Sequence, residues 1–162
     1  MPTHFERMLQ LADDIFATKD DPEQLDVDQD VLERLRSLHP STVSEYDEGE
    51  GPAAWILLIP TTLELMQQFL DQTLSEKALF ESTLPGISYE ALYLCSAMVL
   101  EEYRRKGIAK RLTVSAIEDI RKEHPLKALF VWTFSEEGRL GAEAIARLTG
   151  LPLHHRGMPA TS

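Results

Sequence analysis

Apolar residues recur at helical spacing along the first part of the chain, and this pattern predicts two helices. Thr3-x-x-Glu6 has the form of a capping box, so we expect the first helix to begin there. A second helix is expected over residues 31–38, because His39-Pro40 disfavours helical backbone beyond it. The apolar face of the first helix is expected to consist of Phe5, Met8, Leu9, Ala12, Ile15 and Phe16.

Strand patterns follow these helices and then alternate with further helical patterns. Residues 42–46 and 53–59 flank a turn rich in Gly and predict a hairpin. Thr61-x-x-Glu64 predicts the start of a long helix over residues 62–82. The later expected elements are a strand at 87–100, a helix to about Lys122, a strand at 127–134, a helix at 138–148 and a last strand at 151–155. Gly150 is expected to end the last of these helices.

This succession of helices and buried strands predicts an α/β fold. The expected form is an α+β sandwich, in which a mixed sheet is covered by helices on both faces. The chain has 162 residues and is 43% hydrophobic, which suits one domain with a proper core. We therefore expect a single domain over residues 1–162, with an acidic helical N-terminal part at about 1–40.

Charge is distributed unevenly along the chain, whose net charge is −11. Residues 1–50 hold 14 acidic and 4 basic residues, and we interpret them as a solubilising surface that could also attract a cationic amine. The single cysteine, Cys95, excludes an internal disulfide and is typical of a reducing compartment. No apolar run has the pattern of a signal peptide or the length of a membrane span, so we expect a cytoplasmic protein without membrane contact.

A cluster of positive charges lies between Tyr103 and Thr113, after an apolar strand and at the start of a helix. The first backbone amides of a helix have no intrahelical acceptor, and the helix dipole favours an anion beside them. Gly107 would let the main chain approach such an anion closely. The segment therefore predicts a diphosphate-binding loop, with a solvated basic helix start as the alternative. Nucleic acid is not an expected partner, because the acidic remainder of the surface would repel a polyanion.

Within this segment, Arg104-x-x-Gly107-x-Ala109 resembles the (Arg/Gln)-x-x-Gly-x-(Gly/Ala) signature of the GNAT superfamily of N-acetyltransferases. That signature binds the pyrophosphate of acetyl-coenzyme A. The resemblance covers residues 91–123 well and residues 127–151 approximately. It implies an N-acetyltransferase that uses acetyl-CoA as its co-substrate.

The resemblance also implies a geometry for the site. Strands 91–100 and 127–134 would separate, and the pantetheine arm would lie between them. Main-chain groups near the end of the first of these strands would bind the pantetheine amides. The residues that the resemblance assigns to acetyl-CoA are Met98, Val99, Arg104, Arg105, Lys106, Gly107, Ile108, Ala109 and Lys110.

Four features depart from the pattern of that family. The helix expected at 62–82 stands where the family usually has a tight turn. The family's usual acid is a tyrosine four residues before a glycine, and that position falls on Ala146. An asparagine often found in the same helix falls on Arg139. Few residues follow Leu151, so the last sheet edge would be short or completed by a partner subunit, as in a homodimer.

Acetyl transfer needs a group that takes a proton from the amine and donors that stabilise the oxyanion. The candidates for this proton transfer are Tyr93, Glu90 and His154. For each of them the alternative is an ordinary structural role. Strand alternation predicts that Tyr93 and Cys95 share one face. The opposite face is expected to hold Leu94, Ser96 and Met98. No set of histidine, cysteine and carboxylate residues has metal-ligand spacing, so no metal site is expected.

The sequence thus supports three functions. The first is acetyl transfer from acetyl-CoA to a small-molecule or peptide amine, by direct attack in a ternary complex. The second is a non-catalytic GNAT-like module that binds acyl-CoA or another protein. The third is an unrelated α/β interaction domain whose basic loop docks a protein. Binding of acetyl-CoA would separate the first two functions from the third.

Overall fold

Helices and strands alternate through the computed structural model, which describes residues 3–17, 29–133 and 135–156, with backbone alone at 12–17 and 29. The α-helices are α1 (His4–Ala17), α2 (Gln29–Leu38), α3 (Leu63–Leu70), α4 (Glu76–Ser82), α5 (Ile108–Arg121) and α6 (Glu136–Thr149). The strands are β1 (Val43–Asp47), β2 (Pro52–Thr61), β3 (Ala91–Val99), β4 (Ala128–Val131) and β5 (Leu153–His155). Two 3-10 helices are η1 (Pro40–Thr42) and η2 (Glu101–Tyr103).

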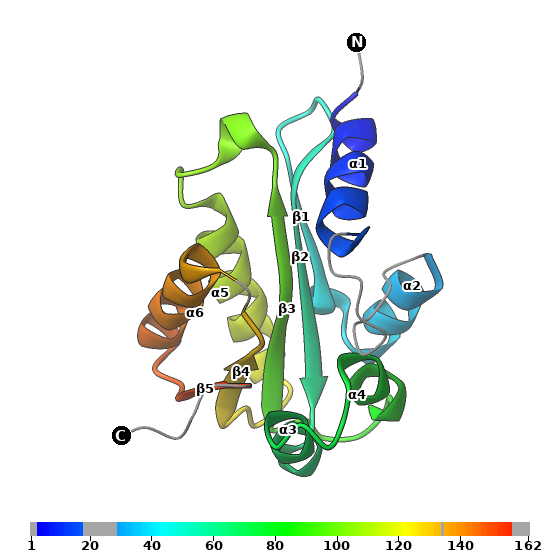
Figure 1. The fold of residues 1–162 in the computed structure, drawn as a ribbon, viewed down its shortest axis with the longest axis vertical. Coiled ribbons are helices and arrows are strands. Elements are labelled where there is room, and N and C mark those ends of the chain that lie inside the picture. Colours follow the sequence, from blue (N-terminus) through cyan, green and yellow to red (C-terminus); the bar gives the residue numbers. More distant parts are fainter. Residues whose placement is uncertain (1–2, 18–28, 134, 157–162) are drawn as a thin grey trace.

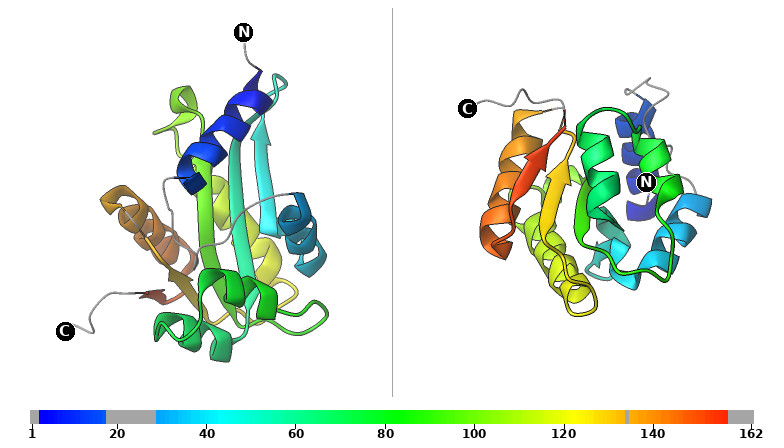
Figure 2. Two further views of the ribbon diagram at one scale, coloured as in Figure 1. Left: turned by 45° about the vertical axis from the view of Figure 1, so that its right-hand side comes forward. Right: turned by 90° about the horizontal axis from the view of Figure 1, so that it is seen from below.

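The strands form one mixed sheet in the order β1-β2-β3-β4-β5. The pairs β1–β2 and β2–β3 are antiparallel, whereas β3–β4 and β4–β5 are parallel. A helix joins each parallel pair, and two right-handed crossovers that advance in one direction place α5 and α6 on the same side of the sheet. Figure 1 shows these two helices on one side and α1, α2 and α4 on the other, as does the view from below in Figure 2. The predicted mixed sheet covered on both faces is confirmed.

The central strands are buried on both faces because helices cover each side. Ile59 of β2 and the adjacent Leu92 and Tyr93 of β3 are at most 1% exposed, and Leu129 and Phe130 of β4 are fully buried. Adjacent strand residues point to opposite faces, so these pairs place apolar side chains in both layers of the core. Full burial of one such side chain stabilises the fold by about 1.5–3 kcal/mol.

The first helix begins as predicted, but its apolar face is only partly in the core. The Thr3 hydroxyl accepts a hydrogen bond from the Glu6 amide at 3.1 Å, which caps α1. Met8 is fully buried, whereas Phe5 is 51% and Leu9 is 46% exposed, so the prediction was wrong for those two residues. The remaining predicted members of that face, Ala12, Ile15 and Phe16, lie outside the side chains that the structure describes.

The long helix predicted at 62–82 is wrong, because the chain turns within it and forms α3 and α4. Gln72 adopts a left-handed conformation with φ of 63°, and Ser75 then caps α4 by accepting a hydrogen bond from the Ala78 amide. The cap of α3 is Thr62, one residue later than predicted. Thr61 belongs to β2 instead, where its hydroxyl lies 2.8 Å from that of Thr83.

A β-bulge at Cys95 changes the faces of β3. Ser96 pairs with Leu57 and Leu94 pairs with Leu58, so Cys95 is an extra residue opposite the β2 strand. A single inserted residue moves every later side chain to the other face. The prediction that Leu94, Ser96 and Met98 share a face is therefore wrong.

The contacts of β3 confirm this exchange of faces. Tyr93 packs against Phe69 of α3. Met98 pairs with Trp55, and the Trp55 ring contacts Phe5 of α1. Tyr93 lies opposite Ile59 and Met98 lies opposite Trp55, and these two β2 residues point to the same face because they are four positions apart. Tyr93 and Met98 therefore face the same layer despite their odd spacing.

Candidate active site

The basic loop lies at the carboxyl end of β3, where the chain crosses toward α5. The Leu100 amide donates to the Ala53 carbonyl at 2.9 Å, which is the last bond of the ladder with β2. The turn η2 follows, and Tyr103 and Arg104 then lead away from the sheet. Gly107 is the first residue outside α5, so the predicted sequence of strand, loop and helix start is present.

Two left-handed residues shape the loop. Arg105 has φ of 64° and Gly107 has φ of 75°. Among the described residues, no acceptor lies within hydrogen-bond reach of the amides of residues 105–110, and the Arg111 amide is the first to bond back, to the Gly107 carbonyl at 3.0 Å. Successive free amides in such a turn form a concave anion-binding surface, and the dipole of α5 adds positive potential there.

Three of the five basic side chains hold the loop in this shape. Arg104 Nε donates to the Val99 carbonyl at 2.9 Å, and Arg111 Nη1 donates to the Lys106 carbonyl at 2.8 Å. The Lys106 ammonium lies 5.5 Å from the centre of the Tyr103 ring, in a cation–π contact. These contacts fix the main chain, which leaves the loop amides presented to solvent.

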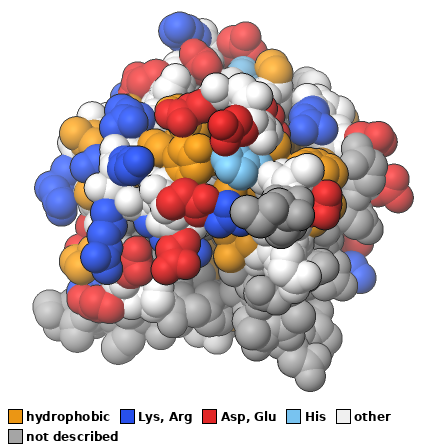
Figure 3. Space-filling view, turned by 90° about the horizontal axis from the view of Figure 1, so that it is seen from above, with side chains coloured by type: hydrophobic (Ala, Val, Ile, Leu, Met, Phe, Trp, Pro, Cys, Tyr) orange, Lys and Arg blue, Asp and Glu red, His pale blue; other side chains and the backbone are white. Residues whose placement is uncertain are grey.

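The other two basic side chains, Arg105 and Lys110, are exposed. Among the side chains that the structure describes, no ion pair joins any of the five cations to a carboxylate. Figure 3 shows Lys and Arg side chains gathered on one side of this end of the molecule, beside a more acidic region. The loop is thus a local positive site on an acidic protein, which favours a small anion.

Beyond Tyr93, the side of β3 that faces β4 has no strand partner among the described residues, and we call it the open edge (residues 94–99). The pairs between β3 and β4 are Ala91–Ala128, Leu92–Leu129 and Tyr93–Phe130. Because β4 ends at Val131, about 20 Å of β3 continues toward the loop without a β4 partner. The predicted separation of these two strands is therefore present.

Main-chain groups of Ala97 and Val99 face the open edge. The Leu100–Ala53 bond fixes the alternation of the β2–β3 ladder, so Met98 bonds toward Trp55 and its neighbours point away from β2. The Val99 carbonyl already accepts from Arg104, whereas its amide is directed to the open edge. Met98, which the resemblance assigns to acetyl-CoA, turns its main chain to β2, whereas Ala97, which the resemblance does not name, faces the open edge.

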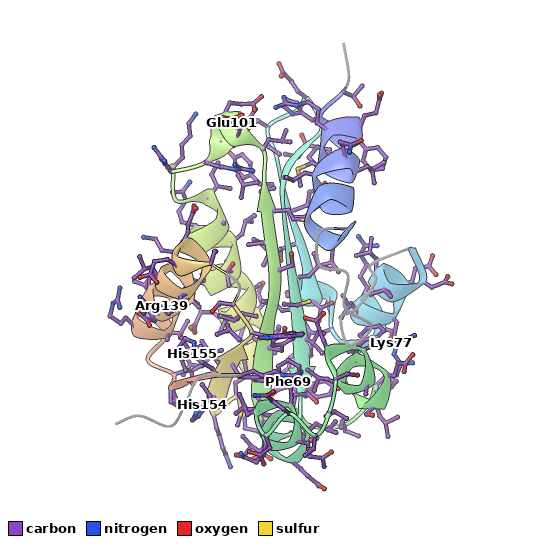
Figure 4. All side chains as sticks on the ribbon, in the orientation of Figure 1. Phe69, Lys77, Glu101, Arg139, His154 and His155 are labelled. Atoms are coloured by element: carbon purple, nitrogen blue, oxygen red, sulfur yellow. The ribbon has the colours of Figure 1, made fainter. Side chains whose placement is uncertain are left out.

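At the closed end of the open edge, aromatic rings from α3, β3 and β4 pack together with Trp132, which follows β4. The ring of Tyr93 stacks on Phe130 at 5.1 Å and meets Phe69 edge-on at 5.0 Å. Trp132 meets the same Phe69 ring at 6.1 Å, and the Arg156 guanidinium lies 4.4 Å from the centre of the Phe69 ring. Figure 4 shows Phe69 near one end of the sheet and Glu101, which begins η2, near the other.

The remaining candidates for proton transfer, Glu90 and His154, lie away from the open edge, whereas Cys95 belongs to it. Glu90 precedes β3 and forms an ion pair of 2.8 Å with Lys127, at the end of the strand opposite the loop. His154 is exposed on β5, whereas His155 Nδ1 is buried and has no hydrogen-bond partner among the described residues. Cys95, at the bulge, is half-buried.

The helix α6 lacks the polar groups that the family often has there. Ala146 occupies the position of the usual tyrosine, and its carbonyl accepts from the Gly150 amide, which ends the helix in the predicted left-handed C-cap. Arg139, at the position of the usual asparagine, pairs with Glu136 and with Glu143. No hydroxyl from Ala146 can therefore protonate a leaving thiolate.

A shallow hollow of about 140 Å³ lies on the flank of α5 that faces β1. It is lined by Tyr46, Ile108, Arg111, Leu112 and Ser115. This flank does not face the open edge, so the hollow and the strand opening are separate features. Within the described stretches, no cluster of His, Cys, Asp and Glu side chains could hold a metal ion.

The profile of the Acetyltransferase (GNAT) family matches residues 5–145, which include β1 to β4, the basic loop and most of α6. The chain therefore belongs to the Acetyltransferase (GNAT) family, and the resemblance carried by Arg104, Gly107 and Ala109 is confirmed. A comparison with curated proteins finds no match. In the part of the chain that the structure describes, no helix is both long and apolar enough to span a bilayer.

Proposed function

We propose that this protein is an N-acetyltransferase that moves the acetyl group of acetyl-CoA to an amine by direct attack. The observation that carries the proposal is the run of free amides at residues 105–110, beside an open strand edge, in a chain of the GNAT family. Neither feature alone defines a coenzyme site. Together they provide an anion-binding turn and an extended hydrogen-bonding edge that leads away from it.

The residues present suit the two polar parts of acetyl-CoA. The amides from Arg105 to Lys110 would bind the diphosphate, with the side chains of those two residues as additional cations. The amides of Ala97 and Val99 would bind the pantetheine arm along the open edge. A Cβ at position 107 would lie 3.0 Å from Arg111 Nη1, so glycine keeps this approach clear.

The reaction places two demands on the protein. Bound acetyl-CoA supplies an acetyl group activated as a thioester, and the amine attacks its carbonyl carbon. Main-chain amides at the bulge and along the open edge are oriented donors that could stabilise the developing oxyanion. A side chain must also take a proton from the amine. The acceptor that we propose is a small-molecule or peptide amine.

Isothermal titration with acetyl-CoA and with desulfo-CoA tests the binding step, because both ligands carry the diphosphate. Gly107→Glu should weaken binding by at least about 100-fold, equivalent to about 2.7 kcal/mol, through bulk and negative charge. Gly86→Glu is the matched control, since Gly86 also has positive φ and lies in an exposed turn with open space around it. Unchanged binding by Gly107→Glu would remove the loop from the site.

A non-catalytic acyl-CoA-binding module is the second candidate, and Ala146 is the observation that favours it. A thiolate would leave without the hydroxyl that the family usually provides. Thiol release from acetyl-CoA, measured across a panel of amines and polyamines, separates the two functions. Binding without release with every amine of the panel would support the module.

A further inference from the structure

Three buried aromatic rings close the opening between β3 and β4, and we call them the end wall (Phe69, Tyr93 and Phe130). The two strands meet at the Tyr93–Phe130 pair. Tyr93 is 1% exposed, and Phe69 and Phe130 are fully buried. The ring centres lie 5.0 to 5.7 Å apart, so the rings contact one another. A ligand that enters the opening from the loop therefore stops at this wall.

Phe69 comes from α3, in the helical segment that stands between β2 and β3. Arg156 holds this segment against the sheet. Its guanidinium lies 4.4 Å from the centre of the Phe69 ring and 4.5 Å from the centre of the Trp132 ring. Its Nη1 donates to the Leu74 carbonyl, in the turn after α3, at 3.2 Å. Arg156 is only 6% exposed, so moving the Phe69 ring would break buried contacts.

The length of the pantetheine arm brings the thioester close to the end wall. The arm contains two amides and spans about as much as four residues of extended chain, roughly 13 Å. Measured back from Val99, where β3 ends, this length reaches Cys95, two residues from Tyr93. The side chains of residues 94–96 are only half-buried, so a ligand can lie against this part of the strand. The acyl group, which continues beyond the sulfur, then points to the wall.

We infer that the end wall limits the acyl group to a short chain, with Phe69 and the adjacent Trp132 as the residues that set the limit; this inference rests on the proposed binding of acetyl-CoA. An acetyl group has one carbon beyond the carbonyl carbon. A longer chain has to displace rings from a closely packed core or lift the thioester off the open edge. The site therefore takes acetyl-CoA and rejects butyryl-CoA and longer straight-chain acyl-CoAs.

A matched pair of substitutions in the inserted segment separates the wall from general packing. Phe69→Ala shortens the wall and should admit a longer chain. Phe80→Ala is the control, because Phe80 is also buried in that segment, at 5% exposure, with the Arg34 guanidinium 5.3 Å from its ring centre. Phe69→Leu, which leaves a smaller cavity, replaces Phe69→Ala if the latter protein does not fold.

Titration calorimetry with acetyl-CoA, butyryl-CoA and hexanoyl-CoA, without an amine, measures the selectivity independently of turnover. A single methylene changes discrimination in an apolar site by about 10-fold or more, so wild type should bind acetyl-CoA at least about 10-fold more tightly than hexanoyl-CoA. Butyryl-CoA should lie between them. Phe69→Ala should remove most of this difference, and Phe80→Ala should keep it.

A second readout locates the acyl group. In acetyl-CoA labelled with 13C at the methyl carbon, the methyl proton resonance should shift on binding, because the currents of the nearby aromatic rings alter its local field. The shift should decrease in Phe69→Leu and in Trp132→Leu, and Phe80→Ala should preserve it.

Equal affinity of wild type for acetyl-CoA and hexanoyl-CoA would overturn the inference and leave acetyl-CoA binding standing. A methyl shift that responds to neither Phe69→Leu nor Trp132→Leu would have the same consequence. Selective binding without thiol release would support the inference in a non-catalytic module. Absence of acetyl-CoA binding would overturn the inference and the proposed function together.

Discussion

The guanidinium of Arg7 forms two hydrogen bonds of 2.6 Å with the carboxylate of Glu102, and this pair ties α1 to the turn before the basic loop. The next residue, Tyr103, meets the His4 ring edge-on at 5.7 Å and the Tyr46 ring at 6.3 Å. Residues from α1 and β1 thus surround the start of the loop. The acidic N-terminal part, which sequence reasoning treated as a solubilising surface, also holds the loop in place.

The Arg7–Glu102 pair should make stability depend on acid pH. The Arg7 hydrogen bonds lower the pKa of Glu102 to about 2, whereas an unfolded glutamate titrates near 4.3. The pair therefore stabilises the fold above about pH 4.3, and this contribution is lost as pH falls toward 2. In urea unfolding, Glu102→Gln should be less stable than wild type at pH 7, and the difference should shrink over that interval.

Glu101→Gln is the control for this measurement, because the Glu101 carboxylate does not hydrogen-bond Arg7. It should follow the wild-type profile. A stability difference between Glu102→Gln and wild type that stays constant from pH 7 to pH 2 would contradict the assignment.

Arg105 should show opposing effects on stability and binding. A left-handed backbone costs a residue with a Cβ about 1–2 kcal/mol, and glycine avoids this but loses about 0.5–1 kcal/mol through its flexibility in the unfolded chain. Arg105→Gly should therefore raise the free energy of unfolding by up to about 1 kcal/mol. It should also weaken acetyl-CoA binding several-fold and reduce its salt dependence, because a cation beside the diphosphate is lost.

Gln72→Gly is the matched control, since Gln72 has φ of 63° in the turn between α3 and α4. It should gain similar stability and leave acetyl-CoA binding unchanged. Titration calorimetry at two salt concentrations and urea unfolding give both quantities. Equal affinity in Arg105→Gly and wild type would exclude Arg105 from the anion site.

The local pattern of the basic loop was sufficient to predict its structure. A strand, a glycine and a helix start are short-range features, and the conformation of Gly107 follows from its own lack of a side chain. The mixed sheet covered by helices on both faces followed from the alternation of apolar runs and helical patterns. These features depend on residues that are neighbours in the sequence, so a single sequence is enough to predict them.

Features that depend on contacts between distant segments were not predictable from the pattern. Cys95 is an ordinary residue in an apolar run, and nothing in the sequence marks it as a bulge. The break at Gln72 has no Gly or Pro nearby, and helical periodicity continues across it. From the sequence alone, Glu76 would be expected as a charge on a helix surface. In the structure α4 packs back against the sheet, and the Glu76 carboxylate accepts a hydrogen bond from Tyr93. In each case tertiary packing decides the conformation.

A second pH effect should come from His124. Burial lowers its pKa below the usual value of about 6.5, and the neighbouring His39 lowers it further. Its Nδ1 accepts from the Tyr89 amide at 3.3 Å, which requires an unprotonated nitrogen. The neutral ring therefore contributes its full stability above about pH 6.5, and this is lost as pH falls through the folded pKa.

His124→Asn tests this contribution, because the amide oxygen can accept from the Tyr89 amide without titrating. The difference in unfolding free energy between wild type and this variant should change between pH 7.5 and pH 5, with wild type losing more. A difference that does not vary with pH would show that His124 does not titrate differently in the folded state.

Because Ala97 and Met98 point their amides in opposite directions, proline at these two positions should affect different properties, coenzyme binding at Ala97 and stability at Met98. Proline removes the backbone amide hydrogen, so its cost depends on where that amide points. The Met98 amide lies in the ladder with β2, and Met98→Pro should strongly destabilise the fold. The Ala97 amide faces the open edge, so Ala97→Pro should be tolerated better while it removes a donor for the pantetheine arm.

Urea unfolding and calorimetric titration with acetyl-CoA measure the two effects separately. Ala97→Ser serves as the control, because it keeps the amide hydrogen at an exposed position. We expect Ala97→Pro to bind acetyl-CoA about tenfold more weakly than Ala97→Ser, the equivalent of one lost hydrogen bond. If Ala97→Pro unfolded as readily as Met98→Pro, the Ala97 amide would belong to the β2 ladder, and the register drawn from the Leu100–Ala53 bond would be wrong.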